Sequence, residues 1–156
     1  MRPLDITIPV QVCALDELPA PDRELVQAAK DATAGSYAPY SHFKVGAAIR
    51  MADGTIVTGA NQENAAFSSG TCAERSACFS AGARFPAMDM DKIAIAAWTS
   101  GDFQAKPISP CGACRQALLE YEHKQGRPMQ VILYGRDECY LLPSVASTLP
   151  LCFTDF

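Results

Sequence analysis

Two short segments decide the fold of this chain: Thr71-Cys72-Ala73-Glu74-Arg75 and Ser109-Pro110-Cys111-Gly112-Ala113-Cys114. Each predicts the start of a helix. Thr71 is a suitable N-cap for a helix over residues 72–83, because its hydroxyl can accept a backbone N–H. Ser109 is a second candidate N-cap, and Pro110 favours the first helical position. We therefore expect two helix N-termini, each carrying cysteine, to converge on one site.

The cysteines in these segments predict a zinc site. Thiolate sulfur is a preferred zinc ligand, so Cys111 and Cys114 can clamp one ion per chain while Cys72 supplies a third sulfur. Three protein ligands leave one position for water, whose pKa then falls to about 7. Glu74 lies two residues after a ligand, where it can move protons between water and substrate. This pattern is typical of a hydrolytic zinc enzyme.

Each half of the pattern has another interpretation. Cys111 and Cys114 alone could form a redox pair or half of a structural zinc ribbon. Thr71 and Glu74 have the spacing of a capping box, which starts a helix without any catalysis. Taken together, however, the segments match zinc base deaminases, in which a His or Cys ligand precedes the glutamate by two residues and Pro-Cys-x-x-Cys follows. Cys72 stands here in the place of the histidine.

Three thiolates carry more negative charge than one zinc ion neutralises, which weakens its Lewis acidity. Arg75 lies beside the site in sequence and can donate hydrogen bonds to the thiolates. The alternative is an ordinary exposed surface arginine. Arg115 is a weaker candidate for the same charge-tuning role.

From about Asp22 to Pro150 the sequence resembles the small, homotetrameric cytidine deaminases. Four stretches in the family's order carry this resemblance: Tyr37-Ala38-Pro39-Tyr40-Ser41-His42-Phe43-Lys44-Val45-Gly46-Ala47-Ala48, Asn61-Gln62-Glu63-Asn64-Ala65, Cys72-Ala73-Glu74-Arg75 and Pro110-Cys111-Gly112-Ala113-Cys114-Arg115-Gln116. The resemblance implies a single zinc-dependent domain over residues 22–156, preceded by an N-terminal arm over residues 1–21.

The family's substrate contacts can be carried onto matching residues. The resemblance implies that Asn61 and Glu63 hold the ribose hydroxyls, that Phe43 packs against the pyrimidine ring, and that Ala73 contacts the substrate. An amide, a carboxylate and an aromatic face suit these tasks chemically. Without the resemblance, Asn61 would be a turn residue and Phe43 a core aromatic.

The implied reaction is hydrolysis of cytidine and 2′-deoxycytidine to uridine and 2′-deoxyuridine with release of ammonia, a step of pyrimidine salvage. Zinc-bound hydroxide would attack C4 while Glu74 relays protons. The alternatives are a deaminase of another small amino-heterocycle, such as a nucleoside antibiotic, and a non-catalytic zinc-binding protein. Gln62 and Phe67 depart from the family's common residues, which are apolar and tyrosine respectively.

The resemblance also implies a homotetramer with active sites at subunit interfaces. The residues to inspect for such contacts are Ala65, Phe67, Phe153 and Phe156.

Composition favours a small-molecule enzyme of the cytosol. The chain has 156 residues, 49% of them hydrophobic, and a net charge of −4 without a basic run, which disfavours nucleic-acid binding. No membrane span or signal peptide is evident. Seven cysteines, an odd number, favour thiols and metal ligands over disulfides. The four that are not predicted ligands are expected to be small buried hydrophobes: Cys13, Cys78, Cys139 and Cys152.

Periodicity places these motifs in an α/β fold. We expect a helix after Asp22 that ends near Gly35, and an extended arm or edge strand where Ile6, Ile8, Val10 and Val12 alternate with less apolar residues. We expect a hairpin of two strands over residues 43–50 and 55–60, and further strands over residues 93–98 and 131–134. A short last helix is expected over residues 144–149. The complete prediction is a three-layer α/β/α, cytidine-deaminase-like fold with a mixed, mostly parallel five-stranded sheet.

Overall fold

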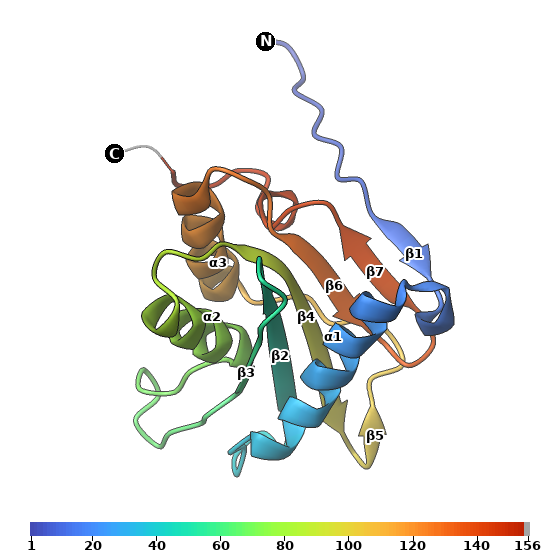
Figure 1. Ribbon diagram of the computed structural model, residues 1–156, viewed down its shortest axis with the longest axis vertical. Helices are drawn as coiled ribbons and strands as arrows, with labels where there is room; N and C mark the ends of the chain where they lie inside the picture. The colour runs from blue at the N-terminus through green and yellow to red at the C-terminus, as the bar shows by residue number, and fades with distance from the viewer. Residues whose placement is uncertain (155–156) are drawn as a thin grey trace.

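The structure, a computed structural model, describes residues 1–154. The prediction that Phe156 lies at a subunit interface therefore falls outside the described residues. Three helices and one sheet make up the fold (Figure 1). The helices are α1 (Ala20–Ala32), α2 (Ala73–Arg84) and α3 (Gly112–Gln125).

The strands form one twisted sheet in the order β1-β7-β6-β4-β2-β3, and β5 pairs with β4 off this path. Their bounds are β1 Gln11–Cys13, β2 Lys44–Met51, β3 Ile56–Ala60, β4 Met90–Thr99, β5 Asp102–Phe103, β6 Gln130–Tyr134 and β7 Cys139–Leu142. Among the described strands, β4 with β6 is the one parallel pair, since the other pairs run antiparallel.

The predicted α/β class is confirmed, but the predicted sheet was wrong in two details. It has seven strands instead of five, and it is mostly antiparallel instead of mostly parallel. Short connections over residues 52–55 and 135–138 join β2 to β3 and β6 to β7. Two neighbouring strands joined by so short a connection must run antiparallel, because a parallel pair needs a crossover of a dozen or more residues. The parallel pair arises because α3 supplies the crossover between β4 and β6, as a parallel connection requires.

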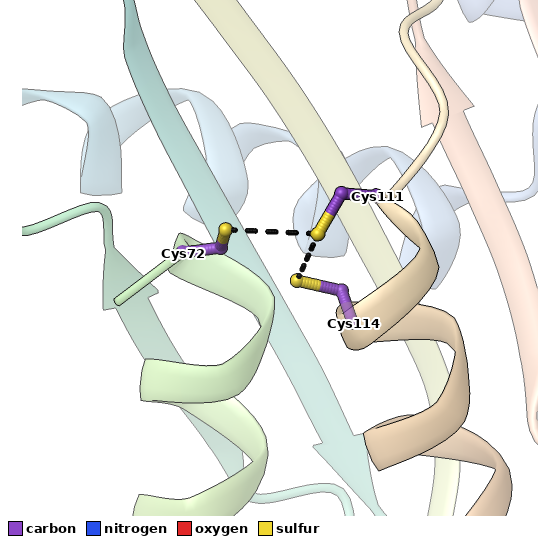
Figure 2. Close-up of side chains that lie close together, drawn as sticks. All are labelled: Cys72, Cys111 and Cys114. Atoms are coloured by element: carbon purple, nitrogen blue, oxygen red, sulfur yellow. Dashed lines mark hydrogen bonds between the residues drawn. The ribbon is translucent and has the colours of Figure 1, made fainter. Parts of the chain in front are cut away.

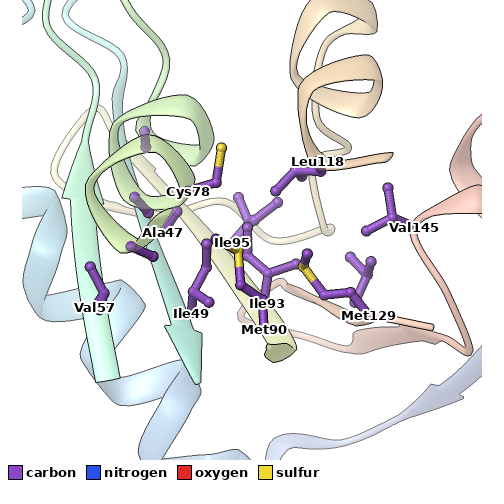
Figure 3. Close-up of a cluster of buried hydrophobic side chains, with 14 of the residues drawn as sticks. Ala47, Ile49, Val57, Cys78, Met90, Ile93, Ile95, Leu118, Met129 and Val145 are labelled. Carbon is purple, nitrogen blue, oxygen red and sulfur yellow. The ribbon is translucent and has the colours of Figure 1, made fainter. Parts of the chain in front are cut away.

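Alternation along the central strands separates two hydrophobic cores. Ile49, Ile93 and Ile95 point to the face covered by α2 and α3, where the larger core lies (Figure 3). The intervening alanines, such as Ala48 and Ala94, point to α1. Small residues on that face let α1 approach the sheet closely, and the large residues fill the space under α2 and α3.

One glycine marks how closely α1 approaches. A Cβ on Gly46 of β2 would lie 2.1 Å from the Ala29 carbonyl oxygen and 2.8 Å from the Thr33 nitrogen. No side chain fits there, so the glycine fixes the spacing between α1 and the sheet. Gly46 belongs to the stretch that begins at Tyr37, so this packing also places the start of β2 at the site described below.

Both cysteine-bearing helices begin later than predicted. Cys72 is the N-cap of α2 and Cys111 is the N-cap of α3, and neither side chain caps its helix. The predicted N-caps were therefore wrong. Thr71 instead exchanges two backbone hydrogen bonds with Gln62, each 2.9 Å long, and Ser109 stays in the loop before α3.

The ends of the chain are less regular than its centre. Residues 1–10 have no regular secondary structure, and the predicted edge strand forms only as β1, which pairs with β7. The predicted last helix is the 3-10 helix η3 (Ala146–Thr148), shorter than expected. Among residues 1–154, no helix is both long enough and apolar enough to cross a membrane.

Candidate metal centre

The N-terminal ends of α2 and α3 lie side by side and bring three cysteine sulfurs together (Figure 2). Cys72 Sγ lies 3.9 Å from Cys111 Sγ, which lies 3.3 Å from Cys114 Sγ. All three sulfurs lie within 4.8 Å of one another. A tetrahedral zinc ion with Zn–S bonds of about 2.3 Å needs sulfurs about 3.8 Å apart. The predicted cysteines thus fit one zinc ion.

The group offers three ligands and no more among residues 1–154. A structural zinc site is normally closed by a fourth protein ligand, whereas a catalytic site keeps one position for water or substrate. Cys114 is buried, Cys72 is half-buried and Cys111 is exposed. The cluster is therefore open on the side of Cys111 and Cys72, as a site that admits substrate must be.

The surroundings favour thiolate at Cys72. A hydrogen bond with Cys114 lowers the pKa of Cys72, burial opposes this, and contact with the Arg75 guanidinium lowers it further, to about 5. The hydrogen bond with Cys72, together with burial, raises the pKa of Cys114. Each of these two cysteines lies in or next to the first turn of a helix, where partial positive charge also favours thiolate.

Arg75 lies where charge compensation would need it. It lines the same cavity as Cys72. Burial lowers the pKa of its guanidinium, but the hydrogen bonds and charges of Cys72 and Cys114 together raise this pKa above its ordinary value. Its Nε is buried and has no hydrogen-bond partner within residues 1–154. Buried donors are normally paired, so this one is available to an anionic sulfur or a bound ligand. Arg115, the second candidate, points to other groups.

Glu74 is the buried carboxyl beside the sulfurs. It lies in the first turn of α2 and is 4% exposed. Burial raises its pKa, the charge of Cys72 raises it further, and hydrogen bonds from its own backbone and from Cys114 oppose the shift. A carboxyl with a raised pKa is easier to protonate, so it can return a proton as well as accept one. The alternative capping box with Thr71 does not form.

A cavity of about 690 Å³ opens beside Cys72 and Arg75. It brings both predicted ribose-binding residues, Asn61 and Glu63, next to the candidate metal centre. The remaining predicted site residues are not among those that line it: Phe43, Ala73, Glu74, Cys111 and Cys114. The lining residues are Tyr40, Ser41, Asn61, Gln62, Glu63, Asn64, Ala65, Phe67, Gly70, Thr71, Cys72 and Arg75.

The turn before β2 donates hydrogen bonds to the carboxylate of Glu63. The backbone N–H groups of Tyr40 and Ser41 donate to it at 2.9 and 3.3 Å, and the Ser41 hydroxyl donates at 2.5 Å. The Ser41 hydroxyl is the main cause that holds the pKa of Glu63 below its ordinary value. Glu63 is therefore a fixed, charged acceptor. Sequence reasoning missed Ser41, although it lies inside the stretch that carries the resemblance.

Asn61 ties the same turn to the sheet. Its Oδ1 accepts from the Val45 N–H at 2.8 Å, and its Nδ2 donates to the Phe43 carbonyl oxygen at 2.9 Å. One N–H of the amide remains for a ligand. The Phe43 side chain is half-buried. Asn61 thus connects the predicted ribose contacts with the predicted ring contact through the backbone at the start of β2.

An α/β fold with a three-cysteine open metal centre and a buried carboxyl at a helix N-terminus defines a zinc hydrolase of the base-deaminase class. Comparison with known families matches residues 19–126 to the cytidine and deoxycytidylate deaminase zinc-binding region. A cytidine deaminase from Halalkalibacterium halodurans is 46% identical over 103 residues, covering 64% of this chain and 71% of that protein.

Solved structures agree with the sequence comparison. A cytidine deaminase from Burkholderia pseudomallei is 40% identical, with a TM-score of 0.71 over 83% of this chain and 97% of that one. A cytidine deaminase from Mycobacterium tuberculosis is 30% identical, with a TM-score of 0.67 over 85% and 96%. The chain belongs to the cytidine and deoxycytidylate deaminase family, whose model covers more than half of it.

Proposed function

We propose that this chain hydrolyses cytidine and 2′-deoxycytidine to uridine and 2′-deoxyuridine, with ammonia as the second product. The observation that carries the proposal is the placement of Glu74, buried and proton-competent, beside three sulfurs that fit one zinc ion. The adjoining cavity, with a carboxylate and an amide suited to sugar hydroxyls, extends the proposal from a base to a nucleoside. The relatives named above are cytidine deaminases.

The residues divide the chemistry among them. Cys72, Cys111 and Cys114 would hold zinc, which would supply the Lewis acidity that makes a water molecule nucleophilic at neutral pH. Glu74 accepts a proton as water attacks C4 and returns protons to the ring nitrogen and to the departing amine. Water is thereby consumed and ammonia released. Arg75 moderates the negative charge of the sulfurs.

The sugar of the nucleoside is held by two residues that line the cavity, and its ring by two residues outside that lining. Glu63 accepts from a ribose hydroxyl, and the unused N–H of Asn61 donates to one. The ring of Phe43 packs against the pyrimidine, and Ala73, the first residue of α2, contacts the substrate. The roles of Glu63 and Asn61 are supported by their hydrogen bonds, which hold Glu63 against the turn at Tyr40 and Asn61 against the backbone at Phe43 and Val45.

We further propose a homotetramer whose subunits complete one another's cavities. Phe67 and Tyr40 line the cavity yet are 102% and 60% exposed, and Phe153 is 67% exposed near the C-terminus. Apolar surface at the mouth of a site is typical of an interface.

Residues 22–156 form one zinc-dependent domain behind an arm of residues 1–21. The enzyme works in the cytosol, in pyrimidine salvage.

One experiment tests the function. Zinc per chain is measured first, and ammonia release is then followed with cytidine, deoxycytidine, cytosine, CMP, adenosine and single-stranded DNA. The expected result is one zinc per chain and turnover of the first two compounds. Turnover of another amino-heterocycle alone would replace the proposed substrate, and bound zinc without turnover of any compound would indicate a non-catalytic zinc protein.

A further inference from the structure

Cys111 is the most exposed of the three predicted metal ligands, and like Cys72 it precedes its helix as the N-cap. Cys114 is buried inside the first turn of α3, whereas Cys111 is exposed and precedes the helix as its N-cap (Figure 2). Its position therefore depends on the loop of Ser109 and Pro110 that leads into it. Whatever fixes this loop also fixes one of the three sulfurs.

Arg115, one turn into α3, holds this loop. Its Nε donates to the Pro110 carbonyl oxygen at 2.7 Å, and its Nη2 donates to the Ser109 hydroxyl at 3.1 Å. The Pro110 carbonyl belongs to the peptide bond that joins Pro110 to Cys111, so this bond fixes the peptide plane before the ligand. The planar guanidinium presents its donors in a rigid fork, and two of them engage consecutive residues.

The third donor of Arg115 anchors the fork. Nη1 donates to the carbonyl oxygen of Thr148, a buried residue at the end of η3, at 2.7 Å. The start of η3 is held by another residue of α3, since Glu122 accepts from the N–H groups of Val145 and Ala146 at 2.7 and 3.1 Å. Two residues of α3, Glu122 and Arg115, therefore hold the two ends of η3 by hydrogen bonds.

We propose that Arg115 is a positioning residue for the metal centre: it uses η3 as a fixed support and holds the Pro110–Cys111 peptide so that the Cys111 sulfur meets the other two. This assigns Arg115 a task different from Arg75, because its guanidinium binds carbonyl and hydroxyl oxygens instead of sulfur. The inference rests on zinc binding by Cys72, Cys111 and Cys114, and it does not depend on which nucleoside is the substrate.

The test compares variants of the full-length chain loaded with zinc. The measurement is the rate of zinc transfer to the chromogenic chelator 4-(2-pyridylazo)resorcinol, together with the thiolate-to-metal absorption of the Co²⁺-substituted protein. Residues that orient metal ligands typically contribute about 10–100-fold to metal affinity. We therefore expect Arg115→Ala to release zinc about 10-fold faster or more, with an altered Co²⁺ spectrum.

Three further variants separate positioning from general packing. Arg115→Lys keeps the positive charge but lacks the planar guanidinium with its several donors, so it should also release zinc faster than the parent. This variant replaces Arg115→Ala in the test if the alanine variant does not fold. Glu122→Gln weakens the other end of η3 without touching Pro110. Gln116→Ala removes a 2.9 Å hydrogen bond from Gln116 Nε2 to the Phe153 carbonyl and leaves Arg115 intact. Gln116→Ala should stay within about twofold of the parent. Glu122→Gln loosens the support of Arg115 from its far end, so it should release zinc faster than the parent but more slowly than Arg115→Ala.

Two results would overturn the proposal. One is zinc release and a Co²⁺ spectrum unchanged in both Arg115 variants. The other is equal acceleration in Arg115→Ala and Glu122→Gln with equal loss of thermal stability, which would reduce Arg115 to a general packing contact. A parent protein without zinc would overturn this inference and the proposed function together. Zinc lost faster from the Arg115 variants supports the inference even if cytidine is not the substrate.

Discussion

Replacing Glu63 with alanine tests the predicted nucleoside site most directly. A carboxylate has about four acceptor positions. Three donors already occupy it, two backbone N–H groups and the hydroxyl of Ser41. The structure therefore leaves room for about one hydrogen bond to a ribose hydroxyl. A single hydrogen bond to a charged group is worth about tenfold to a hundredfold in binding, so Glu63→Ala should lower kcat/KM for cytidine by that factor.

The comparison with free cytosine isolates the ribose contact. Cytosine has no sugar, so its kcat/KM should be nearly the same in the parent and in Glu63→Ala. The assay follows the ultraviolet change of both substrates in both proteins. Ser41→Ala is the matched control, because it removes one of the three donors and keeps the carboxylate. Its effect on cytidine should have the same sign and be smaller.

Two outcomes would refute this reasoning. An equal loss on cytosine and cytidine would mean that Glu63 supports the turn at Tyr40 and Ser41 as a whole and has no specific sugar contact. Unchanged kinetics on cytidine would mean that the ribose binds elsewhere in the cavity.

Three other predictions follow from the same structure. Glu74→Gln should retain zinc, measured by metal analysis, and lose about 10²–10⁴-fold in kcat, the usual range for general acid-base catalysis; near-parental turnover would remove the assigned role. Asp22→Ala should lower the free energy of unfolding, measured by urea titration, by about 3–5 kcal/mol. The variant leaves the buried Lys92, whose Nζ lies 2.7 Å from the Asp22 carboxylate, without its counter-charge, and it also removes the 3.1 Å ion pair with Arg50. Gly46→Ala should cost about 1–3 kcal/mol or more, since its Cβ would overlap the backbone of α1; a thermal midpoint equal to the parent's would contradict the close packing of α1.

The cluster of three cysteines could be predicted from the sequence because its geometry is mostly local. Cys111 and Cys114 are brought together by one helical turn, so their spacing alone fixes the pair. Cys72 joins them from another element, and only the match to a known pattern connected it with the others. The zinc site was therefore accessible from spacing and chemistry before any coordinates.

The sheet could not be predicted as well. The direction of β6 and β7 is set by the short turn between them, where the Gly135 N–H donates to the Glu138 carbonyl oxygen at 2.9 Å. The sequence predicts a strand at residues 131–134 but not its partner, β7. The class of fold depends on the large-scale alternation of helices and strands, which survives such an omission, whereas strand number and direction do not.

The helix starts were wrong for a reason that also bears on the site. Thr71 and Ser109 are the better local caps, but Gln62 pairs with the backbone of Thr71 and Arg115 binds Ser109, so both residues stay outside the helices. Cys72 and Cys111 become the N-caps, and neither side chain accepts a helix N–H. A hydroxyl that caps a helix offsets part of the positive charge at the helix N-terminus. The cysteines at these N-caps do not cap, so this positive charge remains available to the sulfur atoms. Local capping preference therefore fails at the starts of α2 and α3, where the proposed metal centre uses helix ends without a capping hydroxyl. Functional sites are the places where local preference and functional requirement are expected to disagree.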